Sequence, residues 1–385
     1  MKKNYLFGML ALAAMTMVGC SNDEVVNDYS QDNAIQFGTY VGRDASGRGT
    51  VIDTNGAEGN VALSEFGVFA FYRDNKAEAG AEPNFMNNQK VEKDENSPLG
   101  NGWTYSPVKY WPNEKEDLID FYAYAPYEEQ GKTWDGQNVI VNINSEVSDQ
   151  KDYLWATPVL NQGKQAVDDE VVFTFHHALT RVGFKVEAVI DEVNDQEDGA
   201  NPDTDYQNKD YYDDATTVSV QEVELYGPFF SSAKLNLNDG TLSDKTGHTE
   251  SYELGYADFV KDVADKVTTT KQQLNIPSEY MMFIPSEYQD IKVRVKYTVT
   301  TKDDKLTNKE IAVVNDITSK VFDFTFEQGK AYNFVLHLGL TSVKLSATVS
   351  DWTDGGDVVV NVPINFEKST TTPGENGGFS GGPAN

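Results

Sequence analysis

Three groups of residues in this sequence could carry chemistry: a serine in a glycine-rich run, four histidines and a single cysteine. The run Gly378–Gly382 matches the G-x-S-x-G pattern of a nucleophilic serine, but that serine needs a strand before it and a helix after it. The glycine-rich C-terminus offers neither element. His176 and His177 are adjacent, so on a strand they would point to opposite faces and could not chelate one metal ion. We therefore predict no catalytic residue, no metal site, no cofactor and no enzymatic activity.

The many carboxylates do not define a site either. The chain has 61 Asp and Glu residues, so close pairs arise by chance, and the roughly 5–10 Å separation that a glycosidase needs is a distance in space. Residues 194–205 loosely match a calcium loop, but Asn194, Gln196 and Asp205 stand at its first, third and twelfth positions. The pattern predicts no specific calcium site.

The overall charge narrows the class of partner. Thirty-one Lys and Arg residues against 61 acidic residues give a net charge of −30. Nucleic acids and anionic lipid surfaces both attract clustered basic side chains, so we exclude nucleic acid as a partner. Hydrophobic residues make up 39% of the chain and aromatic residues 12%, which is enough to form packed cores.

The cysteine, Cys20, lies where a signal peptide would end. Lys2 and Lys3 are followed by a largely apolar stretch, 5–18, that is too short to span a membrane but suits a signal peptide. Small residues precede Cys20, and the sequence resembles a bacterial lipoprotein signal with cleavage between Gly19 and Cys20. Acyl chains on Cys20 would anchor the protein in the outer membrane. The alternative is an ordinary secretory signal with a cysteine at this position by chance.

The residues after the cysteine are acidic. The segment 20–33 contains Asp23, Glu24, Asp28 and Asp32 and resembles the export signal of surface lipoproteins of the Bacteroidetes. It predicts a tether on the outward face of the cell. A generic acidic linker is the alternative.

Most of the remaining chain has the pattern of β-strands. In 291–300, Ile291, Val293 and Val295 alternate with Lys292 and Arg294, as in a sheet with one buried and one solvated face. Similar alternation occurs in 332–338 and 343–349. Other β-branched and aromatic runs predict further strands at 35–41, 66–72, 118–124, 139–143, 171–175, 182–189, 218–225 and 358–362.

One helix is predicted at 256–267, where apolar residues recur at helical spacing. Many short strands with regular turns indicate an all-β fold of two tandem β-sandwich domains. We expect a signal peptide at 1–19, a tether at 20–33, domains at 34–180 and 181–368, an acidic loop at 191–214 and a flexible tail at 369–385.

Several runs, taken in order, resemble one family. They are listed here: Ile35-Gln36-Phe37, Phe66–Tyr72, Tyr105–Pro112, Leu118–Pro126, Asp152–Ala156, Val172–Val182 and Met282–Pro285. Behind an acidic lipoprotein signal, they resemble the fimbrillin family of Bacteroidetes, which are type V pilus subunits and related surface adhesins. The resemblance implies two tandem transthyretin-like, Greek-key β-sandwich domains.

The resemblance also implies a route of assembly. In such proteins an arginine-specific protease removes the N-terminal segment with its first strand, and a strand from another subunit enters the groove, so that a head-to-tail polymer grows. The matching residues are Arg43 and Arg48, which lie among small residues. Two ordinary loop arginines are the alternative.

The identity of the donor strand stays open. The run 358–366 could serve as a donor, or as the last strand of its own domain. Whether the chain forms the stalk, anchor or tip of a pilus also stays open, as does any host or bacterial surface ligand. The competing function is a glycan-binding surface lipoprotein that does not polymerise, for which Trp103, Trp134, Tyr211 and Tyr212 are available in expected loops. Packing in the sandwich core or in turns is the alternative for these four side chains.

Overall fold

The fold is described by a computed structural model. The described residues are 33–41, 52–53, 61–74, 81–99, 101–129, 134–135, 137–163, 170–188, 216–255, 260–262, 272–274, 280–302, 310–338, 343–351 and 354–368. Strands dominate these ranges, and a single-turn 3-10 helix, η3 (Val147–Asp149), interrupts them. No helix within them is long and apolar enough to cross a membrane.

The first half of the chain forms an eight-stranded sheet. Its strand order is β1-β11-β9-β7-β4-β5-β6, and β10 pairs with β7. The strands are β1 (Gln36–Val41), β4 (Glu65–Arg73), β5 (Met86–Lys93), β6 (Trp103–Thr104), β7 (Leu118–Ala125), β9 (Leu154–Ala156), β10 (Val159–Gln162) and β11 (Glu170–His177). Among these pairings, only that of β1 with β11 is parallel. The first strand therefore joins the sheet without a hairpin connection.

The second half forms a twelve-stranded sheet. Its order is β16-β13-β20-β21-β25-β24-β23-β12-β18, with β17, β19 and β22 paired beside this path. The strands are β12 (Thr180–Ala188), β13 (Thr216–Phe229), β16 (Thr249–Gly255), β17 (Val260–Asp262), β18 (Gln272–Leu274), β19 (Met281–Phe283), β20 (Ser286–Lys302), β21 (Glu310–Ser319), β22 (Phe322–Phe326), β23 (Lys330–Leu338), β24 (Val343–Asp351) and β25 (Asp354–Lys368). A short two-stranded sheet, β2 (Ile52–Asp53) with β3 (Val61–Ala62), completes the first half.

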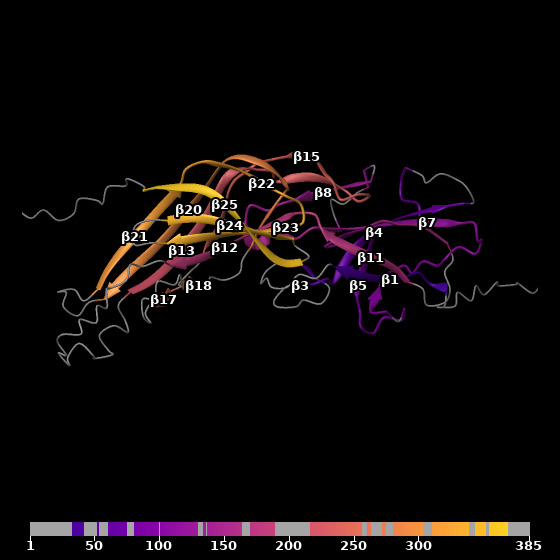
Figure 1. Cartoon of the computed structure of the whole chain (residues 1–385). Helices are drawn as coiled ribbons and strands as arrows, with labels where there is room; N and C mark the ends of the chain where they lie inside the picture. The colour runs from indigo at the N-terminus through magenta and orange to yellow at the C-terminus, as the bar shows by residue number, and fades with distance from the viewer. Residues whose placement is uncertain are drawn as a thin grey trace, which may run out of the picture.

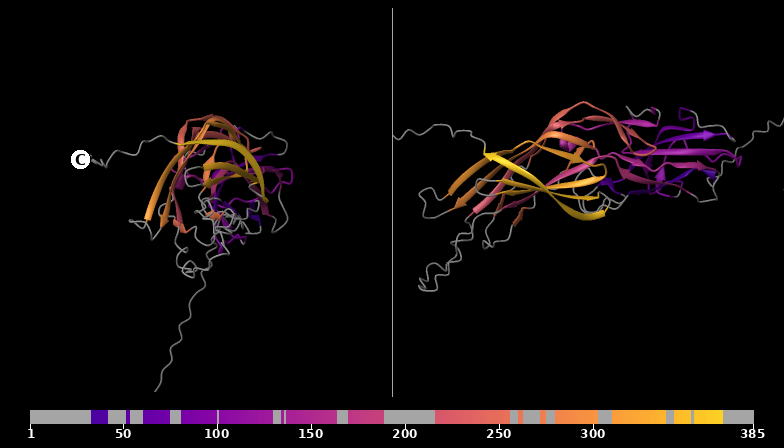
Figure 2. Two further views of the ribbon diagram at one scale, coloured as in Figure 1. Left: turned by 60° about the vertical axis from the view of Figure 1, so that its left-hand side comes forward. Right: turned by 45° about the horizontal axis from the view of Figure 1, so that its top comes forward.

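A small sheet connects the two halves. In it β8 (Asn138–Asn142), from the first half, pairs with β14 (Ser232–Asn236), from the second, and β14 pairs with β15 (Leu242–Thr246). Figures 1 and 2 show an elongated molecule in which the indigo and purple strands occupy one end and the orange and yellow strands the other. The β8–β14 pairing lies between these ends (Figure 1).

Two hydrophobic cores pack against these sheets. One core belongs to the first half and contains Phe66, Phe121 and Phe173. The other is larger and joins residues from both halves, such as Tyr122 with Phe283. Since side chains alternate along a strand, the eight-stranded sheet contributes one face to each core.

The all-β fold expected from the sequence is confirmed, and the alternation in 291–300 corresponds to the buried face of β20. Ile291, Val293 and Val295 are fully buried, whereas Arg294 lies on the outer face. The helix predicted at 256–267 is wrong where the structure describes it, because Val260–Asp262 is strand β17, paired with β13. Pairing with a neighbouring strand decided the conformation of that segment over its local periodicity.

Candidate functional site

The most distinctive site in the first half is the position of β1 at one end of the eight-stranded sheet. Its backbone pairs in parallel with β11, from Gln36 beside Glu170 to Val41 beside Phe175. An end strand in a parallel pairing is connected to its neighbour only through distant chain, so nothing local fixes its register. The register must come from buried side chains and from groups on its other edge.

The apolar inward side chains of β1, and that of Ile35 directly before it, are fully enclosed. Ile35, Phe37 and Val41 are 0%, 1% and 1% exposed, whereas Tyr40 on the outward face is 50% exposed. The Phe37 ring lies 5.3–6.2 Å from four other rings, those of Phe66, Tyr105, Phe121 and Phe173. A buried aromatic side chain of this kind stabilises a fold by about 3–5 kcal/mol relative to alanine. Phe37 is therefore the main anchor of β1.

The second edge of β1 is held by side chains and backbone of residues 101–111. The Tyr105 hydroxyl donates to the Ile35 carbonyl at 2.8 Å, and the Asn101 Nδ2 donates to the Phe37 carbonyl at 2.6 Å. The Ile35 N–H donates to the Lys109 carbonyl at 2.9 Å. Both edges of the strand are thus engaged, so β1 lies in a groove between β11 and residues 101–111.

Tyr105 is suited to this role by its surroundings. Burial raises the pKa of its hydroxyl well above the ordinary value, so the group stays protonated and able to donate. It also accepts a hydrogen bond from the Lys109 N–H at 3.2 Å, which fixes its orientation. Tyr105 begins a run that carries the family resemblance, but the sequence does not predict its hydrogen bond or that of Asn101, since their partners, Ile35 and Phe37, lie 70 and 64 residues away.

The chemistry of this groove is recognition of a strand. It offers a row of backbone groups on β11, two side-chain donors aimed at carbonyls, and an aromatic cavity. Removal of β1 would leave the sheet edge unpaired and the aromatic core open to water, and both are strongly unfavourable. An empty groove would therefore favour the entry of another strand.

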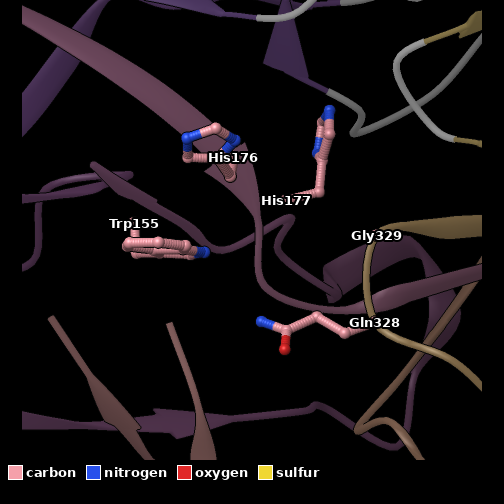
Figure 3. Close-up of a pocket in the computed structure, with 5 residues that line it drawn as sticks. All are labelled: Trp155, His176, His177, Gln328 and Gly329. Carbon is pink, nitrogen blue, oxygen red and sulfur yellow. The ribbon is translucent and has the colours of Figure 1, made fainter. Parts of the chain in front are cut away.

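A second feature lies where the two halves meet. A pocket of about 290 Å³ is lined by Trp155, His176, His177, Gln328 and Gly329 (Figure 3). The Trp155 and His176 rings lie 5.0 Å apart, and the His176 Nε2 lies 3.0 Å from the Thr157 hydroxyl. Burial, and then the adjacent His177, lower the pKa of His176, so this imidazole is neutral at neutral pH.

The adjacent histidines point apart, as their positions on a strand predict. His177 is buried, with its Nδ1 3.0 Å from an Asp152 carboxylate oxygen. The Gln328 side chain donates to the Gly240 carbonyl at 2.7 Å, and Gly240 lies directly against Trp155. The Trp155 indole thus contacts both a turn of the second half and His176, which is the packing of a junction.

Two of the four aromatic residues expected for a glycan site are buried instead of exposed. Trp103 and Trp134 are each 8% exposed, so the expectation of exposed loop positions is wrong for both. Trp103 packs against Phe66 in the core of the first half, and Trp134 lies among Phe69, Phe71 and Tyr122 in the core shared by both halves. Because burial of a large apolar ring is energetically favourable, both tryptophans pack inside the protein. Tyr211 and Tyr212 lie outside the described residues.

The remaining predicted positions also lie outside the described part of the chain. These are Gly19 and Cys20 of the lipoprotein signal, and Arg43 and Arg48 of the processing segment. The described chain ends at Val41, directly before the two arginines, and resumes at Ile52. Within the described ranges no cluster of three or more His, Cys, Asp or Glu residues could hold a metal ion.

Comparison with solved structures finds proteins that are described as cell adhesion or fimbrial proteins. A candidate cell adhesion protein of Bacteroides uniformis is 18% identical, with a TM-score of 0.45, and the match covers 84% of this chain and all of that one. The C-terminally truncated tip fimbrial protein Mfa3 of Porphyromonas gingivalis is 10% identical, with a TM-score of 0.36, over 75% of this chain and 94% of that one.

Sequence comparison gives the firmer result. No curated protein sequence matches the chain. A family model described as fimbrillin-like, however, matches residues 53–352, which is well over half of the length. The resemblance noted in the sequence is therefore confirmed, and the chain belongs to the fimbrillin-like family.

Proposed function

We propose that this chain is a structural subunit of a pilus or a related cell-surface adhesin and has no enzymatic activity. Membership of the fimbrillin-like family supports this role. The observation that carries the proposal is the first strand, β1, which is held in a groove whose other walls come from distant chain. A strand bound in this way can be exchanged for a strand from another subunit.

The proposed route begins at the N-terminus. The signal peptide, 1–19, is removed, Cys20 is lipidated, and the acidic tether, 20–33, holds the protein on the outer face of the outer membrane. An arginine-specific protease then cleaves after Arg43 or Arg48, and β1 leaves with the tether. These arginines follow Val41, the last residue of β1, so cleavage there separates the strand from the rest of the chain.

Assembly follows from the empty groove. A strand of a second copy enters beside β11, and repetition of this head-to-tail contact builds a filament. The run 358–366 is the proposed donor. It lies in β25, the last of the described strands, far along the sequence from the groove. The division into domains 34–180 and 181–368 belongs to this proposal as well, with β8 bridging them.

The test uses the full-length chain extracted from cells. Treatment with an arginine-specific protease is expected to give a ladder of species that resists sodium dodecyl sulfate, and N-terminal sequencing should identify the cleaved arginine. The variant with Arg43→Ala and Arg48→Ala should stay monomeric, and each single variant shows which site is used. Complete cleavage that yields only monomers would contradict polymerisation by strand exchange.

A further inference from the structure

The loop that holds the second edge of β1 contains an asparagine followed by a glycine. This pair occurs three times in the sequence, at 55–56, 101–102 and 376–377, and only Asn101-Gly102 lies in the described part of the chain. The backbone nitrogen after an asparagine can attack the side-chain amide carbon and close a five-membered succinimide ring. Glycine favours this reaction most, because it has no side chain to hinder the approach of its nitrogen.

The surroundings of the pair leave room for ring closure. Asn101 and Gly102 are both partly exposed, and no atom lies within 4 Å of a Cβ placed on Gly102. The Gly102 N–H makes no hydrogen bond to the described residues, so none of them holds this nitrogen away. The Trp103 N–H donates to Asn101 Oδ1 at 3.4 Å. That oxygen gains negative charge when the amide carbon is attacked, so the donor beside it favours the reaction.

The Asn101 side chain also contacts β1 directly. Its Nδ2 donates to the Phe37 carbonyl at 2.6 Å. Conversion to a carboxylate would replace this donor by an oxygen that can only accept, and two acceptors would then face each other. The Phe37 carbonyl would lose its partner on this edge, which is unfavourable for a polar group in a protein interior. Tyr105 would still hold the Ile35 carbonyl, so β1 would be loosened without losing its other contacts.

We propose that Asn101 is a site of spontaneous deamidation and that its conversion loosens β1. The Gly102 nitrogen bonds to the side-chain carbon of Asn101, and the side-chain nitrogen leaves as ammonia, which carries away the Gly102 proton. Water then adds to one of the two carbonyls of the succinimide and opens the ring. Opening at one carbonyl gives aspartate, and opening at the other gives isoaspartate. Water is the only co-reactant.

Isoaspartate changes the main chain as well as the side chain. The chain then passes through the former side-chain carbon and is one methylene longer directly before Gly102. The Gly102 carbonyl accepts from the Asp94 N–H at 2.8 Å, and the next residue, Trp103, packs 5.0 Å from the Phe66 ring. A longer main chain shifts both contacts. The loosening concerns the single chain, and only its use in the release of β1 rests on the proposed function.

Incubation of the folded, full-length chain in heavy-oxygen water tests the modification. Peptide mapping by mass spectrometry should show isoaspartate and one heavy oxygen at position 101, increasing with time. The rate should be higher in mildly alkaline buffer, because the attacking nitrogen must lose its proton. Asn101→Gln is the control that should stay unmodified, since its longer side chain cannot close the five-membered ring. Conversion of Asn101 in urea but not in the folded chain would overturn the proposal.

Hydrogen exchange tests the effect on β1. Asn101→Asp carries the carboxylate of the product, and the amides of 36–41 should exchange about tenfold faster than in the unmodified chain. Asn101→Ala removes the donor without adding charge and should accelerate exchange severalfold. Asn96→Asp is the matched control, since it adds the same charge at an exposed position of the same segment and should change nothing.

Unchanged exchange in 36–41 after conversion of Asn101, or in both Asn101 variants, would overturn the loosening of β1. Neither measurement uses the arginine-specific protease. Failure of this inference is therefore distinguishable from failure of the proposed function, which the ladder of resistant species tests separately.

Discussion

At the residue scale, the contact between Gly240 and Trp155 shows how tightly the two halves meet. Gly240 has a φ of +76° and lies in a turn of the second half, and a Cβ there would be 2.1 Å from the Trp155 indole of the first half. Glycine is required for both reasons, the left-handed backbone and the close approach. Gly102 has a similar φ of +80° but nothing within 4 Å of an added Cβ.

These two glycines make a matched pair of substitutions. Gly102→Ala should reduce the free energy of unfolding by about 1 kcal/mol, the cost of the left-handed conformation alone. Gly240→Ala should reduce it by about 3 kcal/mol or more, because the indole must also move. Chemical denaturation measures both. In a Trp155→Ala background the additional cost at Gly240 should largely disappear, and a cost that stays unchanged would contradict the packing argument.

The charges on the outer face of the second half make a separate prediction. Arg294 on β20 binds Asp316 on β21 through two hydrogen bonds of 2.8 Å and also reaches Glu222 on β13. The Arg294 guanidinium lowers the pKa of Asp316 below its ordinary 3.8. Because the folded-state pKa is lowered, this pair stabilises the fold above about pH 4 and the stabilisation is lost as the pH falls through the folded-state value.

Asp316→Asn should therefore flatten the loss of stability on acidification. The carboxylate side chain is 40% exposed, so the difference at neutral pH should be below about 1 kcal/mol. Urea denaturation of both proteins between about pH 2 and about pH 7, a range that covers the titration of a carboxylate, measures this difference in the free energy of unfolding. Parallel curves below pH 4 would show that Asp316 does not carry this dependence.

At the element scale, β1 combines a strong anchor with a weak connection to the rest of the chain. Phe37→Ala should lower the free energy of unfolding by about 3–5 kcal/mol, since the side chain is 1% exposed and surrounded by four rings. Tyr40→Ala on the same strand should cost below about 1 kcal/mol because half of that side chain is in water. Thermal denaturation compares the two, and equal costs would contradict the role of Phe37 as an anchor.

The sequence predicts strands best where one face is buried and apolar. The alternation in 291–300 identified β20, and runs rich in aromatic residues identified β4 and β7. β5, with the sequence Met86-Asn87-Asn88-Gln89, carries little apolar pattern and is a strand because β4 and β6 pair with it. Strands of this type depend on partners elsewhere in the chain, so local pattern cannot predict them.

The candidate site was predictable only in part. The run Ile35-Gln36-Phe37 marked the first strand, and a strand is present at Gln36–Val41. The donors on its second edge were not predictable, since a tyrosine hydroxyl and an asparagine amide in a loop have many other uses. For Trp103 and Trp134 the sequence left exposed and core positions open, because a tryptophan in a turn-rich segment can pack inward without any period in the sequence.

At the scale of the whole molecule, β8 ties the halves together. Its five residues pair with β14, and Val141 is fully buried in the core shared by both halves. Val141→Ala should lower the free energy of unfolding by roughly 2 kcal/mol, and hydrogen-exchange protection should fall in β4 and in β20 together. Ile140→Ala, at a residue 45% exposed on the same strand, is the control. Loss of protection in one half alone would show that the halves unfold independently.

The parallel pairing of β1 also affects the order in which the parts of the fold can form. A chain that emerges from its N-terminus presents β1 among its first residues, whereas the register partner of Gln36 is Glu170. The two donors of the second edge, Asn101 and Tyr105, emerge between them. The pairing of β1 with β11 can therefore form only after most of the first half has been synthesised. The groove is complete only when the chain reaches β11, so β1 closes the first half of the fold last although it comes first.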